Sequence, residues 1–139
     1  MSEIGIAADP QLMVEGDHTP EGGQQAFAKL RKRKPWPTAI LCSNDMTAIG
    51  VMRGSYEEKI AIPDQLSVIG FDNIHLSQYI LPPLSTIEMS QAELGRLAFQ
   101  ALLTDVQRKV PSAEGTEYVL GTNFILREST SMNPEKNGK

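Results

Sequence analysis

The most regular pattern of apolar and polar positions in the chain spans residues 38–73. Two short apolar runs, TAILC at 38–42 and LSVIGF at 66–71, flank a segment at 45–58 whose apolar positions recur at helical spacing. Continuous apolar runs of this length are typical of parallel strands that are buried on both faces. The pattern therefore predicts a strand–helix–strand crossover whose two strands are parallel and lie close together in one sheet.

Polar residues follow each of these two predicted strands. Asn44-Asp45 comes after the first run and Asp72-Asn73 after the second. In open α/β sheets, ligands bind beyond the carboxyl ends of the strands, so this edge is the candidate site. Asp72 could accept hydrogen bonds from ligand hydroxyls or a ring N–H, or could instead close an Asx-type turn. Asn44 could contact a ligand, although its position favours capping the helix that follows.

The rest of the chain contains further signals on both sides of this unit. A capping box, Ser90 with Glu93, opens a long apolar helix at 91–108. The basic run at 31–34 is interpreted as a solvated helix end, because cations complement the dipole there, rather than as a phosphate site. The other predicted elements are a strand at 11–15, a helix from Pro20 (capped by Thr19) to the basic run, strands at 84–87, 117–120 and 123–127, and a loop at 110–116.

Two glycines interrupt the predicted helix at 45–58. Gly50 and Gly54 lie four residues apart, so they share one helix face. Each glycine in a helix interior is less favourable than alanine by about 1 kcal/mol. The two glycines would let another backbone approach, and we expect a close contact on this face, with tight packing on the sheet favoured over a special interface.

The composition of the chain argues against several classes of function. The chain has 139 residues, enough for one domain, and a net charge of -4, which argues against a nucleic-acid-binding surface spread over it. Cys42 is the single cysteine and is expected to be buried, so no intramolecular disulfide can form. The sequence has no apolar run that could span a membrane, no signal-peptide core and no metal-ligand spacing.

One enzymatic alternative uses the two strand-end aspartates. Asp45 and Asp72 together would suit a metal or phosphoryl-transfer site. The sequence has no Lys or Ser/Thr partner at an expected spacing, no glycine-rich phosphate loop and no nucleophile elbow. A strand-end carboxylate hydrolase or phosphotransferase therefore remains a third-ranked interpretation.

Five segments together resemble the effector-binding region of the lactose/galactose-repressor (LacI/GalR-type) family of bacterial transcription regulators. They occur in the family's order and roughly at its spacing: VEGDHTPEGG, PTAILCSNDMTAIGVM, IPDQLSVIGFDN, YILPPLSTIEMSQAELGRLAFQALL and LREST. The resemblance implies an α/β fold, the truncated parallel-sheet, three-layer lobe of a type I periplasmic-binding-protein-like domain. Residues 1–130 would form its C-terminal lobe and residues 131–139 a disordered tail.

The resemblance also implies roles for individual residues. Asn44 and Asp72 match polar contacts to an effector, often a sugar or a purine, and His18 matches a position that often holds an aromatic residue. Met89 stands where the family frequently has a polar contact, often Gln. Lys59 stands where the family usually has a glycine, so a left-handed helix end there would cost about 1 kcal/mol. No cofactor or metal is implied.

A homodimer is implied by the same resemblance, through the helix at 45–58 and the segment at 74–81. Independently, these segments carry more apolar surface than a small lobe easily hides. The expected interface residues are Met46, Ile49, Met52, Ile74, Tyr79 and Ile80. The helix at 91–108 would pack on an N-terminal lobe that, like the DNA-binding helix-turn-helix, is expected to be missing from this chain.

The leading interpretation is thus the effector-binding and dimerisation region of a cytoplasmic transcription regulator, which contacts DNA only through the missing domain. It is not expected to be an enzyme or to contact a membrane. The runner-up is a fragment of a periplasmic sugar-binding protein of the same fold. Because one lobe supplies one wall of a cleft, we expect weak affinity for the effector.

Overall fold

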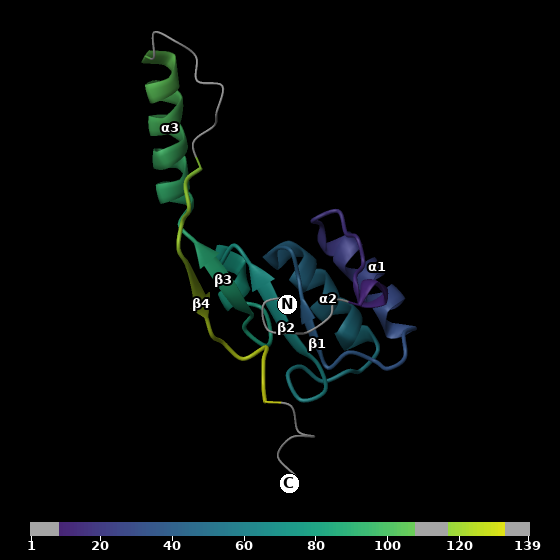
Figure 1. Ribbon diagram of the computed structural model, residues 1–139. Coiled ribbons are helices and arrows are strands. Elements are labelled where there is room, and N and C mark those ends of the chain that lie inside the picture. The colour runs from purple at the N-terminus through teal and green to yellow at the C-terminus, as the bar shows by residue number, and fades with distance from the viewer. Residues whose placement is uncertain (1–8, 108–116, 133–139) are drawn as a thin grey trace.

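The computed structural model describes residues 9–107 and 117–132 (Figure 1). Helices and strands alternate along the first part of the chain, as the α/β class requires. The elements are η2 (Pro10–Leu12), α1 (Pro20–Arg31), β1 (Ala39–Leu41), α2 (Asp45–Glu57), β2 (Ser67–Phe71), η3 (His75–Gln78), β3 (Ser85–Met89), α3 (Gln91–Gln107) and β4 (Thr122–Ile125).

The four strands form one sheet in the order β1-β2-β3-β4. β1 pairs with β2 and β2 with β3 in parallel, in registers that set Ile40 opposite Val68 and Phe71 opposite Ile87. β4 joins the other side of β3 in the antiparallel direction. The predicted crossover is confirmed, because the two apolar runs are parallel neighbours joined through α2.

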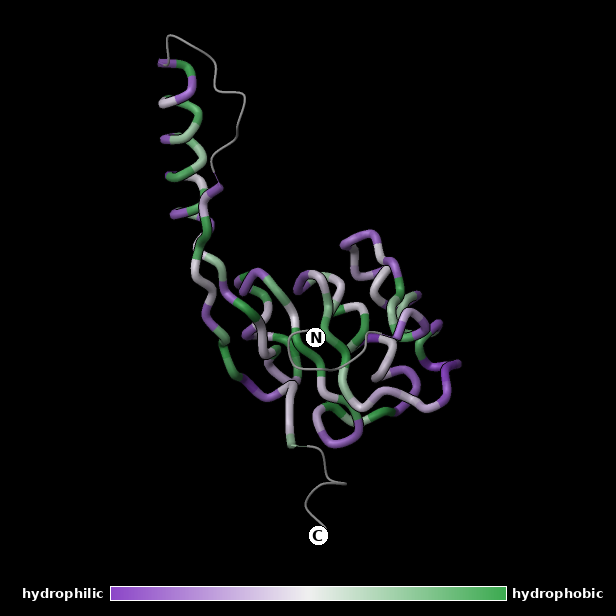
Figure 2. Tube along the Cα trace, viewed as in Figure 1, coloured by the Kyte–Doolittle hydropathy of each residue, from purple (hydrophilic) through white to green (hydrophobic). Residues whose placement is uncertain are grey.

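The core lies between the sheet and two helices. α2 packs on β2 and α1 packs on α2, so both helices lie on the same side of the sheet (Figure 1). The strands are among the most apolar stretches of the chain (Figure 2). The buried apolar cluster consists of Phe27, Leu30, Ile40, Cys42, Ala48, Val51, Met52, Leu66, Val68 and Leu84.

The expectation that these strands are buried on both faces is wrong for β1. Ile40 is buried, whereas its neighbours Ala39 and Leu41 are exposed, Leu41 by 68%. Side chains alternate between the two faces of a strand, and among the described residues helices cover one face only. Cys42 is buried, as the sequence predicts.

α1 and α2 approach each other through glycines. A Cβ at Gly23 would lie 2.2 Å from the Thr47 carbonyl oxygen, and one at Gly50 would lie 1.9 Å from the Pro20 carbonyl oxygen. At Gly54 the neighbour is the ring of Phe27, 2.6 Å away. A close contact at the helix glycines is therefore confirmed, but the expectation that it is made with the sheet is wrong, because the atoms next to Gly50 and Gly54 belong to α1.

α2 ends in the left-handed conformation that was expected there. Lys59 has a φ of 58°, its N–H donates to the Tyr56 carbonyl (3.1 Å), and the next N–H, of Ile60, donates to the Ser55 carbonyl (2.9 Å). These bonds satisfy carbonyls of the last turn. A side chain at this position is unfavourable, because glycine is the residue that adopts positive φ without strain.

Two predicted strands are absent from the described residues. Residues 11–15 do not pair with the sheet, because Pro10 and the Asp9 carboxylate, which accepts from the Gln11 N–H (2.8 Å), start the short 3-10 helix η2 instead. Residues 117–120 are not a strand either, because their would-be partner β3 ends at Met89 and the chain turns into α3. The strand predicted at 123–127 is β4, and the one at 84–87 is β3.

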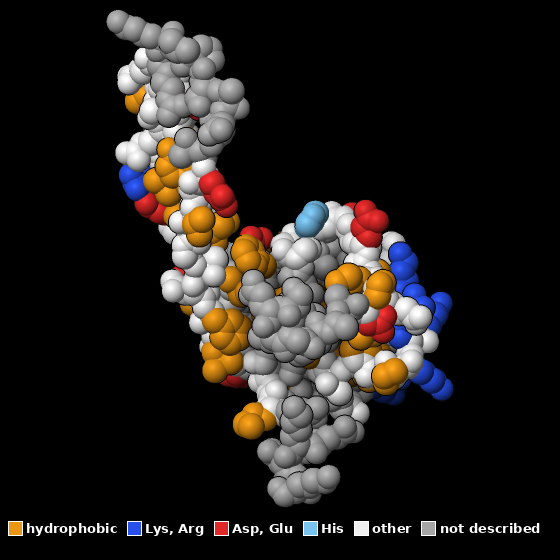
Figure 3. Space-filling model, in the orientation of Figure 1, with side chains coloured by type: hydrophobic (Ala, Val, Ile, Leu, Met, Phe, Trp, Pro, Cys, Tyr) orange, Lys and Arg blue, Asp and Glu red, His pale blue; other side chains and the backbone are white. Residues whose placement is uncertain are grey.

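α3 is a helix as predicted, but it extends away from the rest of the protein (Figure 1). None of its residues is buried, and apolar side chains line it (Figure 3), including Phe99, Leu102 and Val106, each more than half exposed. The predicted loop at 110–116 and most of the predicted tail lie outside the described residues. Within residues 9–107 and 117–132, no helix is long and apolar enough to cross a membrane.

Candidate ligand-binding rim

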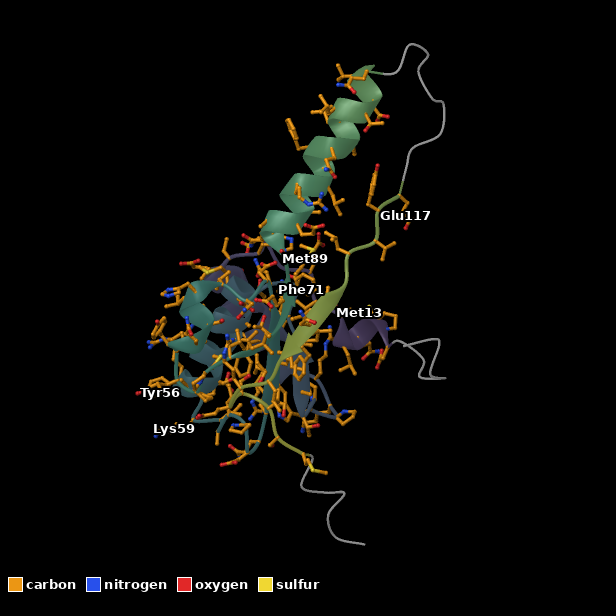
Figure 4. All side chains as sticks on the ribbon, turned by 90° about the vertical axis from the view of Figure 1, so that its left-hand side faces the viewer. Met13, Tyr56, Lys59, Phe71, Met89 and Glu117 are labelled. Carbon is orange, nitrogen blue, oxygen red and sulfur yellow. The ribbon has the colours of Figure 1, made fainter. Side chains whose placement is uncertain are left out.

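The carboxyl ends of β1, β2 and β3 meet at one edge of the sheet, which we call the carboxyl rim. It comprises Ser43-Asn44 after β1, Asp72-Asn73 after β2, and Met89 at the end of β3. Figure 4 shows Phe71 and Met89 together at this edge, beside the start of α3. Tyr56 and Lys59, at the far end of α2, lie at the opposite edge (Figure 4).

The structure brings His18 and Asn44 together on this rim. The Asn44 Oδ1 accepts from the Thr47 N–H (2.8 Å), which caps α2, and its Nδ2 donates to the His18 carbonyl (3.1 Å). The capping interpretation of Asn44 is thus confirmed, and both ends of its amide are occupied. The exposed His18 imidazole has its Nδ1 3.3 Å from the Ser43 hydroxyl.

Asp72 differs from Asn44 in that no described residue donates a hydrogen bond to its side chain. Its backbone N–H donates to the Ile87 carbonyl (2.9 Å), which continues the β2–β3 pairing. Its φ is 107°, in the region that favours glycine, and its half-buried carboxylate accepts no hydrogen bond from the described residues. The Asx-turn alternative is therefore wrong, because that turn needs the carboxylate to accept from a nearby backbone N–H.

Asp45, in the first turn of α2, is a structural carboxylate. It is fully buried, and its two oxygens accept from the Thr86 hydroxyl (2.6 Å) and the Ile74 N–H (2.8 Å). Burial raises its pKa above the ordinary value, although these two hydrogen bonds oppose the shift. Because both oxygens are occupied, the pairing of Asp45 with Asp72 as a metal or phosphoryl-transfer site finds no support.

Arg127 binds Asn73 at the rim; the sequence placed Asn73 at this edge without a role of its own, and it missed Arg127. The Arg127 guanidinium donates to the Asn73 Oδ1 (2.7 Å), the Leu84 carbonyl (2.7 Å) and the Ser77 hydroxyl (3.0 Å). The Asn73 Nδ2 donates to the Glu88 carboxylate (2.8 Å). The available signal was the LREST segment, whose Ser129 also bridges β2 and β3: its hydroxyl donates to the Val68 carbonyl (2.6 Å) and accepts from the Ser85 N–H (2.8 Å).

Met89 completes the rim with an apolar side chain. It is half-buried at the end of β3, opposite Thr122 of β4. A thioether accepts hydrogen bonds only weakly, so this position contributes contact surface rather than polar recognition. Within the part of the chain that the structure describes, no three His, Cys, Asp or Glu side chains gather as a metal site would require.

Five of the six residues expected at a dimer interface are at least partly accessible. Tyr79 is 63% exposed, and Met46 is 37% exposed. Met52 is instead buried in the core, so counting it as exposed apolar surface is wrong. A groove of 280 Å³ lies between α2 and the segment after η3, lined by Ile49, Met52, Arg53, Tyr56, Ile80 and Leu81.

With the fold and the geometry of the rim described, comparison with known proteins identifies the class of this domain. Residues 1–130 match the periplasmic binding protein-like domain family, and the chain belongs to this family. Its relatives and structural neighbours show it to be of the LacI/GalR effector-binding type, as the sequence segments predict.

Three similar proteins illustrate the relationship. The chain is 41% identical over 134 residues to the transcriptional repressor CytR of Escherichia coli, covering 96% of this chain and 39% of that protein. It is 38% identical over 122 residues to the repressor PurR of Glaesserella parasuis, covering 86% and 36% of the two chains. A LacI family regulator from Enterococcus faecium, solved with bound ribose, is 36% identical with a TM-score of 0.68 and covers 81% and 41%.

These comparisons bear on the competing interpretations. The relatives are transcriptional repressors and not enzymes, which confirms the expectation that the chain is not an enzyme and disfavours the hydrolase or phosphotransferase alternative. The repressor names also favour a regulator over a periplasmic sugar-binding protein. The chain spans less than two fifths of the length of these two relatives.

Proposed function

We propose that the carboxyl rim binds a small polar effector, a sugar or a purine-like molecule, and that the chain is the effector-responsive part of a transcription regulator. The observation that carries this proposal is the Asp72 carboxylate. It lies at the end of β2, where ligands bind in open α/β sheets, and is half-buried without a hydrogen-bond donor among the described residues. Partly buried carboxylates are ordinarily paired, so this one is suited to accept from ligand hydroxyls or a ring N–H.

Backbone conformation at the rim supports the same assignment. Four non-glycine residues among those described have positive φ, and three of them, His18, Asp72 and Asn73, lie on or beside the rim. Such conformations persist only where the surroundings enforce them, and they gather at ligand sites. The fourth, Lys59, closes α2 at the other end of the molecule.

The chemistry of the rim sets the class of ligand. The Asp72 carboxylate, which no described residue binds, and the His18 imidazole present hydrogen-bonding atoms to several hydroxyl or N–H groups at once. His18 also supplies an aromatic face, on which a sugar or base ring can stack. The bound ribose in the Enterococcus faecium regulator is consistent with a polyhydroxyl ligand.

Saturation-transfer NMR against pentoses, hexoses, nucleosides and nucleobases tests this proposal. Because the rim is an open edge, we expect weak binding by a subset of these compounds. Asp72→Ala should weaken that binding by about tenfold or more, since a hydrogen bond to a charged group is worth about 1.5–3 kcal/mol. Asp64→Ala is the matched control, because Asp64 is an exposed carboxylate at the amino-terminal edge of β2. Equal effects of the two substitutions would contradict the proposal.

We further propose that the chain forms a homodimer through the groove between α2 and the segment after η3. Exposed apolar side chains surround this groove, with Tyr56 75% and Leu81 90% exposed. In a C2 dimer the same patch from each copy covers the other, which would remove this surface from water. Met46, Ile49, Ile74, Tyr79 and Ile80 are the residues proposed at the contact, with Met52 beneath them.

Multi-angle light scattering over a range of concentrations tests the dimer. Tyr79→Asp and Ile80→Asp should each shift the mass from two chains toward one, because a charge would be buried at the contact. Phe99→Asp on α3 is the control, since it adds the same charge to a different apolar surface. If only Phe99→Asp dissociates the dimer, α3 rather than the groove holds the copies together.

Regulation follows from these two activities. Effector binding at the rim would alter how the copies are arranged, and a linked DNA-binding domain would read that arrangement. The proposed location is the cytoplasm, because the repressors to which the chain is similar act on DNA. The sequence upstream of this region in its gene tests the assignment: a helix-turn-helix supports it, and a secretory signal would favour a periplasmic binding protein.

A further inference from the structure

The turn that carries Asp72 is held in an unfavourable conformation by groups that do not reach the rim. Asp72 and Asn73 have φ values of 107° and 51°, both in the left-handed half of backbone space. Two successive non-glycine residues there require external restraint. The restraint comes from Arg127, Glu88 and Asp45, which lie on three different elements or segments.

Arg127 is itself fixed to buried groups. Its Nη1 donates to the Leu84 carbonyl and to the Ser77 hydroxyl, and both of these residues are fully buried. Its Nη2 donates to the Asn73 Oδ1 at 2.7 Å. The planar guanidinium can bridge all three acceptors, whereas the single ammonium of a lysine cannot hold the same geometry.

The turn is also held on its other side. The Asn73 Nδ2 donates to Glu88 (2.8 Å), so its amide is fixed at both ends, and the next N–H, that of Ile74, donates to Asp45 (2.8 Å). The Asn73 amide and the N–H groups of Asp72 and Ile74 are therefore all hydrogen-bonded, whereas the Asp72 carboxylate accepts no bond from the described residues. A restrained turn presents that carboxylate in one orientation, which lowers the entropy lost when a ligand binds.

We propose that Arg127 is a positioning residue for ligand binding: acting through Asn73, it holds the Asp72 carboxylate toward the ligand without touching the ligand itself. This inference rests on the proposed role of the carboxyl rim. Without the guanidinium, the Asn73 amide loses one of its two anchors, and the backbone at 72–73 can relax toward the extended conformation that non-glycine residues prefer. That change would rotate the Asp72 side chain away from the rim.

Amide hydrogen exchange and residual dipolar couplings on the full chain test the structural half of the proposal. In Arg127→Met, exchange at the Ile74 N–H should accelerate at least tenfold more than at the core amide of Val51, and the couplings at 72–74 should change. Arg96→Met is the matched control, because it removes an exposed guanidinium from α3. Equal acceleration at Ile74 and Val51 would overturn the proposal, since Arg127 would then contribute only to overall stability.

Titration with ribose, followed by NMR, tests the functional half. Arg127→Met should weaken ribose binding about tenfold and Arg127→Lys should recover only part of it, whereas an unchanged affinity in a loosened turn would overturn the positioning role. If Arg127→Met does not fold, Asn73→Gly removes the same amide while allowing positive φ, and the same two changes are expected. Failure of the unaltered chain to bind ribose would count against the rim as a pentose site, while the exchange experiment would still decide the role of Arg127 in the turn.

Discussion

The contact between α1 and α2 gives a sharp test of the fold through the substitution Gly50→Ala. Gly50 is buried in α2, and a Cβ there would lie 1.9 Å from the Pro20 carbonyl oxygen, 2.7 Å from the Pro20 carbonyl carbon and 2.9 Å from the Gln24 nitrogen. All three neighbours are backbone atoms of α1, so no side chain can rotate away. The two helices would have to separate until the shortest contact reached the ordinary 3.4 Å.

Two opposing effects set the size of the change. Alanine is a better helix former than glycine by about 1 kcal/mol, which favours the variant. Forcing an extra methyl group into a packed interface costs about 1–3 kcal/mol, and values at or above the upper end are expected when backbones must move. The helices also enclose Phe27 and Val51, both buried, whose contacts would be weakened. The expected net loss in free energy of unfolding is about 2 kcal/mol.

Urea unfolding followed by far-UV circular dichroism measures this change. The matched control is Gly95→Ala in α3, where nothing lies within 4 Å of the added Cβ. The same substitution should there raise local helix stability by up to about 1 kcal/mol, because only the propensity difference remains. A Gly50→Ala variant as stable as the parent chain would refute the close packing of α1 on α2.

Three further predictions concern single side chains. Lys59→Gly should raise the free energy of unfolding by about 1 kcal/mol in urea titrations, because the position has a φ of 58°. Burial raises the pKa of the Cys42 thiol to about 12, so at pH 8 Ellman's reagent should label it only after denaturation, and rapid native labelling would contradict its burial. The pKa of Asp45 is raised above its ordinary 3.8, chiefly by burial, so its contribution to stability is complete below pH 3.8 and is lost as the pH rises through the raised value. Asp45→Asn should remove that decline from unfolding curves measured across acidic pH, and an unchanged pH dependence would count against it.

The elements that the sequence predicted correctly are those whose signals are local. The apolar runs of β1 and β2 and the Asn44 cap depend on residues adjacent in the chain, so periodicity and spacing suffice to find them. The Ser90–Glu93 capping box is formed only in part: the Ser90 hydroxyl accepts from the Glu93 N–H (3.2 Å), whereas the Glu93 carboxylate binds Arg96. The prediction of a strand at 117–120 was wrong because strand formation also depends on residues distant in the chain: a strand exists only where a partner strand lies beside it.

The sequence predicted where the candidate site lies, but it did not predict which side chains of the site are hydrogen-bonded to one another. The rule that ligands bind beyond the carboxyl ends of strands located Asn44 and Asp72. For each residue the sequence left a structural and a ligand-binding role open, and the hydrogen bonds in the structure were needed to choose between them. The Asn44 amide is hydrogen-bonded to its cap partner Thr47 and to His18, whereas the Asp72 carboxylate accepts no hydrogen bond from residues 9–107 and 117–132. The LREST segment drew attention to Arg127 but not to its contact with Asn73, because the two residues lie 54 positions apart and meet only after β4 has joined the sheet.

The central claim, that the ligand binds at the carboxyl rim, is tested most directly by mapping amide chemical shifts during a titration of the 15N-labelled chain with ribose or with any compound selected by the saturation-transfer screen. We predict that the perturbed amides cluster at Ser43-Asn44, Asp72-Asn73 and Met89. The competing location is a hollow of 440 Å³ at the opposite edge of the sheet, lined by Trp36, Asp64, Ser67 and neighbouring residues. Perturbations confined to that hollow, with the rim unchanged, would contradict the assignment.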